Sequence, residues 1–213
     1  EGAGFRPEII DVGPLCLFNA YHGLEVDEEE VVAIVDIGAS TTDIVIQQGR
    51  VLKFPRSAPV GGNALTSAVS SGMSVDFDEA ENLKVNSGSV SVDSGGGGEL
   101  EDFLSSALDK RVATEIRRSF DFYIAQPDGM AVSRVLLCGG TSRLKGIEEF
   151  LEDRLGVPVE RGNSVEACGM EFASEMLVKA LKAGAKMSHV PVSLHPDVGD
   201  RAPHLQRWRD GMR

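Results

Sequence analysis

The stretch that decides the fold is residues 31–51, VVAIVDIGASTTDIVIQQGRV. It begins with five apolar and mostly β-branched residues, Val31 to Val35, which is the pattern of a buried strand. Gly38 follows in a turn, and residues 43–47 then alternate, as a second strand does. Gly49 turns the chain again into a third strand that runs to about residue 59. We therefore expect three strands joined by hairpins.

The first of these turns has the form Asp-x-Gly-x-x-Thr and carries groups that suit an anion. Gly38 has no Cβ to block an approaching oxygen, and the hydroxyls of Ser40, Thr41 and Thr42 stand beside successive backbone N–H groups. Asp36 ends the preceding strand, where a carboxylate is well placed to hold Mg²⁺ through water. The alternative is a tight hairpin whose small residues only make the turn.

Composition and charge exclude several classes of protein. The chain has 213 residues, enough for one large domain or for a domain with a subdomain, and its 42% hydrophobic content is that of an ordinary globular protein. A net charge of −12 argues against a nucleic-acid partner, which would need clustered Lys and Arg. Three cysteines without Cys-x-x-Cys spacing indicate reduced thiols of a cytosolic protein. No apolar run approaches the ~20 residues that span a bilayer, so we expect membrane contact only through a partner.

Two glycines stand before the helix that follows the third strand. Gly61 and Gly62 allow the backbone to approach a ligand or another segment closely, and Asn63 is the predicted N-cap of a helix that runs to about residue 71. Asp76 is predicted to cap a second helix, which ends near residue 86.

The second helix places Glu81 and Lys84 three residues apart, on one face. The alternative to a binding role is a surface ion pair of little energetic weight. Residues 87–98 are rich in Gly and Ser, which predicts a flexible loop. Residues 99–125 return to apolar side chains at three- and four-residue spacing, so we expect a long helix with one buried face.

A later strand, residues 134–138, runs directly into Gly139, Gly140 and Thr141. A strand that ends in a glycine pair ahead of a helix is the arrangement by which α/β sheets hold a ligand at their carboxyl edge. The alternative is a loop that needs a positive φ. The remaining expected elements are strands at 7–12 and 156–160 and helices at 14–21, 147–155 and 166–183.

This order of elements, together with three short motifs, resembles the second half of the actin and sugar-kinase fold over about residues 8–183. Residues 36–43, DIGASTTD, resemble the second phosphate motif of that superfamily, and residues 137–142, LCGGTS, its adenosine motif. Residues 80–84, AENLK, resemble the segment whose Glu and Lys reach the ribose and base in bacterial actin relatives. The expected fold class is therefore α/β: an actin-like, ribonuclease H-like ATPase fold, with a mixed sheet, flanking helices and a helical insertion.

A narrower resemblance is to the PilM family, the cytoplasmic actin-like proteins of type IV pilus assembly. The stretches that carry it are PEIIDV (7–12), GGNALT (61–66), EIRRSFDFY (115–123), GGTSRLKG (139–146) and GVPV (156–159). The resemblance implies that ATP and Mg²⁺ are the cofactors. It implies that Asp36 holds Mg²⁺ through water. It also implies these nucleotide-binding residues: Gly38, Ser40 and Thr41 for the β- and γ-phosphates, Gly139, Gly140 and Thr141 at the adenosine, Glu81 and Lys84 at the ribose, and Thr42, Gly61 and Gly62 without a more specific role.

The same resemblance implies a scaffold of type IV pilus or type II secretion assembly that grips the N-terminal peptide of a PilN-like inner-membrane protein. Other pilus assembly proteins and a second copy of the chain are further expected partners, and the location is cytoplasmic, peripheral at the inner membrane. In the family, the first half supplies the first phosphate motif and the inserted subdomain that forms the partner groove, and this half is not in the sequence given. The sequence opens at Glu1 without a methionine and reads like a piece of something longer. We expect at most slow ATP hydrolysis, because phosphoryl transfer depends on groups positioned from both halves.

The expected division of the chain has five parts. Residues 1–30 form a connecting strand and helix, residues 31–60 the three-strand core with the phosphate motif, and residues 61–125 the helical insertion. Residues 126–183 form the adenosine-motif segment, and residues 184–213 an irregular tail.

Three rival functions stay open on the sequence alone. One is a sugar-kinase or activase type of phosphotransferase, although this half offers no evident sugar-binding residues. A second is a cell-division protein like FtsA, which should end in an amphipathic membrane helix, and residues 203–209 are too short to make a convincing one. The third is a degenerate cleft in a domain that binds only protein.

Overall fold

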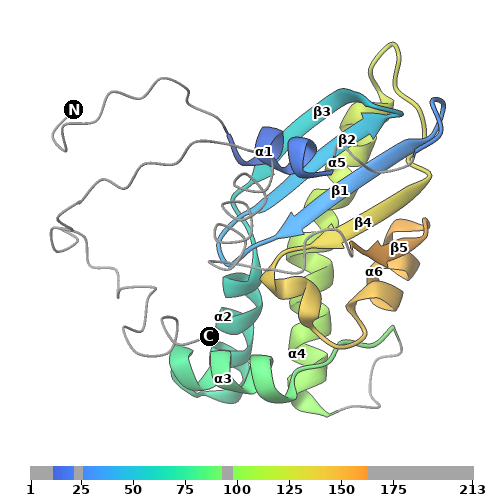
Figure 1. The fold of residues 1–213 in the computed structure, drawn as a ribbon. Coiled ribbons are helices and arrows are strands. Elements are labelled where there is room, and N and C mark those ends of the chain that lie inside the picture. The colour runs from blue at the N-terminus through green and yellow to red at the C-terminus, as the bar shows by residue number, and fades with distance from the viewer. Residues whose placement is uncertain (1–11, 22–25, 93–97, 163–213) are drawn as a thin grey trace, which may run out of the picture.

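The computed structural model describes residues 12–21, 26–92 and 98–162. Its centre is a five-stranded mixed sheet in the order β3-β2-β1-β4-β5 (Figure 1). The strands are β1 (Val31–Ile37), β2 (Thr42–Gln48), β3 (Val51–Ala58), β4 (Arg134–Cys138) and β5 (Val159–Arg161). The three hairpin-linked strands expected around residues 31–59 are confirmed, and both pairings among them are antiparallel.

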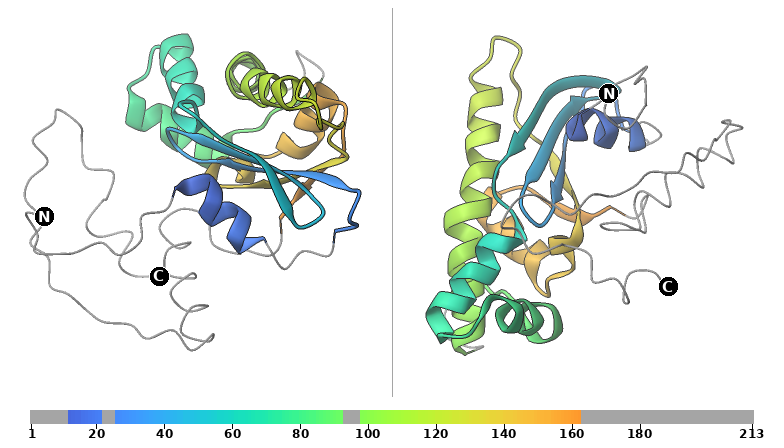
Figure 2. Two further views of the ribbon diagram at one scale, coloured as in Figure 1. Left: turned by 90° about the horizontal axis from the view of Figure 1, so that it is seen from above. Right: turned by 90° about the vertical axis from the view of Figure 1, so that its left-hand side faces the viewer.

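The central strand β1 is apolar on both faces because both faces are covered. On one side, α2 (Gly62–Met73), α4 (Glu99–Ala107), α5 (Thr114–Ile124) and α6 (Ile147–Leu155) pack on the sheet with the larger core cluster. On the other side, α1 (Gly13–Ala20) contributes Leu17 to a smaller cluster with Val32 and Ile34 (Figure 2). Alternate residues of β1 thus enter opposite cores, which explains the unbroken apolar run.

The pairing of β1 with β4 positions the candidate site. These two strands are parallel, with Asp36 opposite Cys138, so the turn after Ile37 and the glycine pair after Cys138 meet at the same edge of the sheet. The helix α3 (Phe77–Ser87) lies beside this edge together with α2 (Figure 1). The side chain of Asp76 accepts a hydrogen bond from the backbone N–H of Glu79, at 2.8 Å, which confirms its predicted capping role.

The long helix expected at residues 99–125 is present but not uniform. Between α4 and α5, residues 108–113 form a π-helical turn, and the Thr114 hydroxyl donates to the carbonyl of Asp109, five residues earlier. The buried stripe runs through Leu104, Leu108 and Val112. Within the described residues, no helix combines the length and apolar character that crossing a membrane requires.

Two local expectations differ from the structure. The prediction that Asn63 is the N-cap of α2 is wrong, because the N-cap is Gly61 and the helix begins at Gly62. The N–H groups of Gly62 and Asn63 donate to the turn after β1, so both residues already belong to the helix. The expected flexible loop 87–98 starts with ordered residues, since Ser89 pairs with Lys145 and Val90 is only 4% exposed. Residues 93–97 of that loop lie outside the described residues, as do the expected strand before Val12, the helix at 166–183 and the tail.

Candidate functional site

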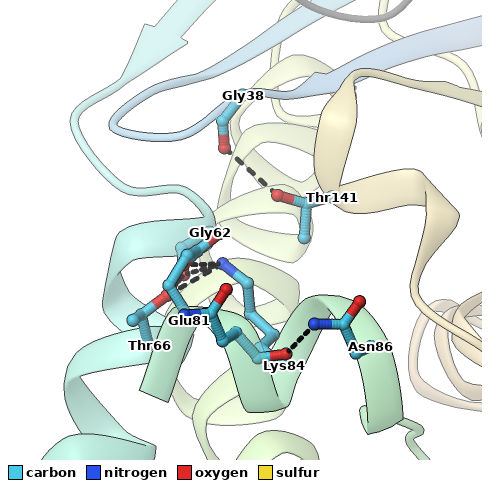
Figure 3. A network of polar contacts seen from close by, with 8 residues as sticks. Gly38, Gly62, Thr66, Glu81, Lys84, Asn86 and Thr141 are labelled. Carbon is cyan, nitrogen blue, oxygen red and sulfur yellow. Dashed lines mark hydrogen bonds and ion pairs between the residues drawn. The ribbon is translucent and has the colours of Figure 1, made fainter. Parts of the chain in front are cut away.

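A cleft of about 670 Å³ opens at the edge of the sheet where β1 and β4 end. Segments from four parts of the chain line it: the turn after β1, the start of α2, the inner face and end of α3, and the residues after β4. The lining residues are Ala39, Gly62, Asn63, Glu81, Lys84, Val85, Asn86, Ser87, Gly88, Gly140, Thr141, Arg143, Leu144 and Lys145. Figure 3 shows the polar contacts along one wall of this cleft.

The turn after β1 is closed by a hydrogen bond from the N–H of Gly38 to the carbonyl of Thr41, at 2.9 Å. Ser40 and Thr41 are exposed on it, so their hydroxyls are available to a ligand. Thr42 differs, because it is fully buried and its hydroxyl donates to the carbonyl of Val60, at 2.8 Å. Among the three predicted hydroxyls, that of Thr42 therefore has a structural partner.

The two glycines before α2 are explained by contact with this same turn. A Cβ at Gly61 would lie 2.5 Å from the carbonyl oxygen of Gly38, so no other residue fits there. The N–H of Gly62 donates to Gly38 at 2.9 Å, and that of Asn63 donates to Ala39 at 2.8 Å. The first amides of α2 are thus bonded to the turn, which they hold in place.

Asp36 is half-buried at the end of β1, beside a second carboxylate, that of Asp43 on β2. Burial, together with the negative charge of Asp43 on the adjacent strand, raises the pKa of Asp36 to about 6. Asp36 and Asp43 are directly paired residues of the β1–β2 ladder. No cluster of three or more His, Cys, Asp or Glu side chains suited to a metal occurs in the described residues. One or two carboxylates fit Mg²⁺, which is bound by few protein ligands and completed by water and phosphate.

Gly139, the first glycine of the pair after β4, lies against Asp36. Gly139 has φ +89°, and a Cβ there would overlap Asp36 Oδ1 and the carbonyl of Ile37. A short 3₁₀ turn begins at Gly140, and Thr141 within it donates from Oγ1 to the carbonyl of Gly38, at 3.3 Å. The expected adenosine motif therefore touches the expected phosphate motif directly.

The wall formed by α2 and α3 carries a charged network. Lys84 Nζ donates to Glu81 Oε2 at 2.7 Å, to Thr66 Oγ1 at 2.8 Å and to the carbonyl of Gly62 at 3.2 Å (Figure 3). The Thr66 hydroxyl also makes a short hydrogen bond to Glu81. The Glu81–Lys84 pair is thus part of a network between two helices, which differs from an isolated surface ion pair.

Five of the twelve predicted site residues line the cleft directly: Gly62, Glu81, Lys84, Gly140 and Thr141. The other seven belong to the turn after β1 or to the backbone beside it: Asp36, Gly38, Ser40, Thr41, Thr42, Gly61 and Gly139. The sequence-based prediction did not include the basic residues Arg143 and Lys145, which also line the cleft. Two cationic side chains three and five residues after Gly140 were a usable signal.

We compared the chain with known protein families, solved structures and curated proteins in order to find its family. The family model described as type IV pilus assembly protein PilM matches residues 1–194. Among solved structures, the chain is similar to one described as the PilM-PilN type IV pilus biogenesis complex, with a TM-score of 0.64 and 28% identity, over 84% of this chain and 50% of that one. It is also similar to MreB5 of Spiroplasma citri bound to ADP, with a TM-score of 0.55 and 17% identity, over 79% of this chain and 60% of that one.

Among curated proteins, the chain is 28% identical over 188 residues to the cell division protein FtsA of Neisseria meningitidis, covering 80% of this chain and 45% of that protein. The chain thus spans about half the length of these relatives. The structural neighbours confirm the expected actin-like fold. Because the family model covers nearly the whole sequence, the chain belongs to the family of type IV pilus assembly protein PilM.

Proposed function

We propose that this chain supplies one side of the ATP-binding cleft of a scaffold protein in type IV pilus or type II secretion assembly. The observation that carries the proposal is the convergence of the turn after β1, the start of α2 and the Gly139–Thr141 segment on one cleft of about 670 Å³. A glycine-containing turn with exposed hydroxyls suits phosphate, and the volume suits a nucleotide.

Each part of the cleft has a distinct role in this proposal. Asp36 holds Mg²⁺ through water, and Ser40 and Thr41 on the turn face the phosphates. Gly140 and Thr141 line the adenosine, and Glu81 with Lys84 forms the ribose side. When bound, Mg²⁺ would neutralise the phosphate charge. The chain's own residues position the nucleotide, and the proposed activity is at most slow hydrolysis, since positioning from both sides of a cleft supplies most phosphoryl-transfer catalysis.

The proposed partner is an inner-membrane protein of the PilN type, bound through its N-terminal peptide. The support is membership in the PilM family and similarity to a chain of a PilM-PilN complex. Contact with the membrane would then come through this partner, which places the protein at the cytoplasmic side of the inner membrane.

The nucleotide proposal is tested by titrating ATP into the chain, and into the longest reading frame that contains it, with and without Mg²⁺. Asp36→Ala should abolish the gain in affinity that Mg²⁺ gives, while Asp121→Ala, an exposed carboxylate on α5, should leave it unchanged. Unchanged Mg²⁺ dependence in Asp36→Ala would refute the metal role, and no ATP binding by either protein would favour a domain that binds only protein.

The partner proposal is tested by fluorescence anisotropy, in which the longest reading frame that contains this chain is titrated into a labelled N-terminal peptide of the PilN-type protein from the same genome. Saturable binding that a scrambled peptide does not reproduce is the expected result. The same titration with ATP present shows whether the nucleotide and the peptide are coupled, because coupling changes both affinities by the same factor.

A second candidate, a cell-division role, is favoured by the identity to FtsA over 188 residues. It is separated from the first by sedimentation with liposomes, using the chain with and without residues 184–213. We expect no sedimentation of either form. Sedimentation that requires residues 184–213 would favour the cell-division role.

A further inference from the structure

Lys84 has no hydrogen left to offer a nucleotide. Its ammonium group carries three N–H donors, and three acceptors take them: Glu81 Oε2, Thr66 Oγ1 and the carbonyl of Gly62. The side chain lines the cleft but is only 11% exposed, so little of it is accessible to a ligand. A nucleotide would have to break one of these charged hydrogen bonds in order to make another.

Glu81 is placed differently. Its side chain is 40% exposed, and both of its hydrogen bonds, from Lys84 and from Thr66, end on the same oxygen, Oε2. Within the described part of the chain, Oε1 has no hydrogen-bond partner. Of the two charged residues, Glu81 is therefore the one with an acceptor available to a hydroxyl group in the cleft.

The third bond of Lys84 leads to the turn after β1. Lys84 donates to the carbonyl of Gly62, and the N–H of Gly62 donates to the carbonyl of Gly38. The N–H of the next residue, Asn63, donates to the carbonyl of Ala39. Thr141 donates to the same Gly38 carbonyl from the opposite side. The ammonium group is thus connected to the turn through one residue of α2.

We infer that Lys84 is a positioning residue: it fixes the start of α2 and thereby holds the phosphate-binding turn in shape, while Glu81 alone of the pair contacts the ribose. This inference rests on the proposed nucleotide function. It assigns to Lys84 a part in binding the phosphates, although its side chain lies on the adenosine side of the cleft.

The test compares ATP with adenosine, which lacks phosphates, by displacement of a γ-phosphate-labelled ATP. Lys84→Met should weaken ATP binding by about tenfold, the effect of about one charged hydrogen bond, and should change adenosine binding by less than twofold. Glu81→Gln should weaken both ligands by the same factor. Lys110→Met, which removes an exposed lysine from another surface, is the matched control and should change neither.

A second measurement needs no nucleotide. Amide exchange of residues 38–42 in the free chain should be faster in Lys84→Met than in the wild type, and unchanged in Lys110→Met. Equal losses of ATP and adenosine affinity in Lys84→Met, or unchanged exchange in the turn, would overturn the inference. If Lys84→Met does not fold, Thr66→Val removes one partner of the same ammonium group without changing shape, and the same outcomes apply to it. If neither the chain nor the longest reading frame that contains it binds ATP, the proposed function fails, and the exchange measurement still decides the role of Lys84.

Discussion

Gly139 and Asp36 share one small space at the ends of β4 and β1. Gly139 has the left-handed φ of +89° that a residue with a Cβ rarely adopts, and the absence of a side chain leaves room for the Asp36 carboxylate. The glycine of the expected adenosine motif thus supports the expected metal-binding carboxylate, although 103 positions separate the two in the sequence.

Gly139→Ala should destabilise the chain by roughly 2–3 kcal/mol, because it combines backbone strain with overlap on Asp36. The adjacent Gly140→Ala is a matched control, since a Cβ there meets nothing within 4 Å. Its free energy of unfolding should stay within about 0.5 kcal/mol of the wild type. Urea unfolding of both variants checks this, and equal stabilities would contradict the packing described for Gly139.

Asp36→Asn should stabilise the free chain at neutral pH. In the wild type, the pKa of Asp36 rises from 3.8 to about 6 on folding, so the folded state binds the proton more tightly than the unfolded state. The stability that this provides is fully present below pH 3.8 and is lost as the pH rises through about 6. The advantage of Asn over Asp should therefore grow by about 2 kcal/mol between pH 4 and pH 7.

Urea unfolding of wild type and Asp36→Asn at the two pH values measures this growth. A constant difference would mean that Asp36 is not buried as described. The same variant should lose the Mg²⁺ dependence of ATP binding, so that stability and the proposed function change in opposite directions at one residue.

At this scale the sequence predicted residue types better than contacts. The Asp-x-Gly turn and the glycine pair were recognisable because only glycine permits such close approaches. The roles of Asn63 and Lys84 were not recognisable, because each depends on a segment that is distant in the sequence. The start of α2 is set by its hydrogen bond to Gly38, and the partners of Lys84 are set by the packing of α2 against α3. Local rules contain no information on such pairings.

Among the elements, β3 and α5 are joined by a small polar cluster. Arg56 on β3 donates to Glu115 at 2.7 Å and to Ser119 at 2.9 Å, both on α5. Phe54 and Phe122 add an aromatic contact, with ring centroids 5.6 Å apart. These contacts attach α5 to the edge strand β3 of the sheet.

Arg56→Met should lower the free energy of unfolding by roughly 1 kcal/mol, since two hydrogen bonds are lost from a partly buried site. The loss stays small because Glu115 keeps its ion pair with Arg118. Arg50→Met, at the exposed turn between β2 and β3, is the control and should be neutral. Thermal or urea unfolding separates the two, and a neutral Arg56→Met would show that the cluster does not contribute to stability.

The elements themselves were largely predictable. Continuous apolar runs indicated β1 and β4, and three- and four-residue spacing indicated the helices, because burial on one or both faces imposes these periods. The π-helical turn at residues 108–113 was not predicted, since the propensities of its residues do not distinguish it from an α-helix. Alternating Val90 and Val92 indicated one short edge strand in the loop at residues 87–98, but its pairing through Ser89 with Lys145 was not predicted, because the partner lies far along the chain.

For the molecule as a whole, the cleft lies at one end of the sheet, and the proposed function makes this chain one side of it. If the cleft binds Mg²⁺ and ATP, ligand at ten times its Kd should stabilise the chain by about 1.4 kcal/mol. For a chain of this length that corresponds to a rise of about 3–6 °C in Tm. Differential scanning fluorimetry of the chain and of the longest reading frame that contains it measures the shift. Asp36→Asn should lack the Mg²⁺-dependent part, and no shift in either wild-type protein would contradict the proposed site.

The π-helical turn has a consequence for how this long helix tolerates change in length. A π turn is what remains when one extra residue enters an α-helix, and the extra residue is accommodated locally by wider hydrogen bonding. Because each residue of an ordinary α-helix advances by about 100° around the axis, the wider turn is what keeps the buried residues before and after it on one face. Deleting one residue between Leu108 and Ala113 would therefore restore an ordinary α-helix and leave Ile116 and Phe120 facing the sheet. The same deletion within α5, where no wider turn absorbs it, would rotate the residues that follow and make the protein less stable.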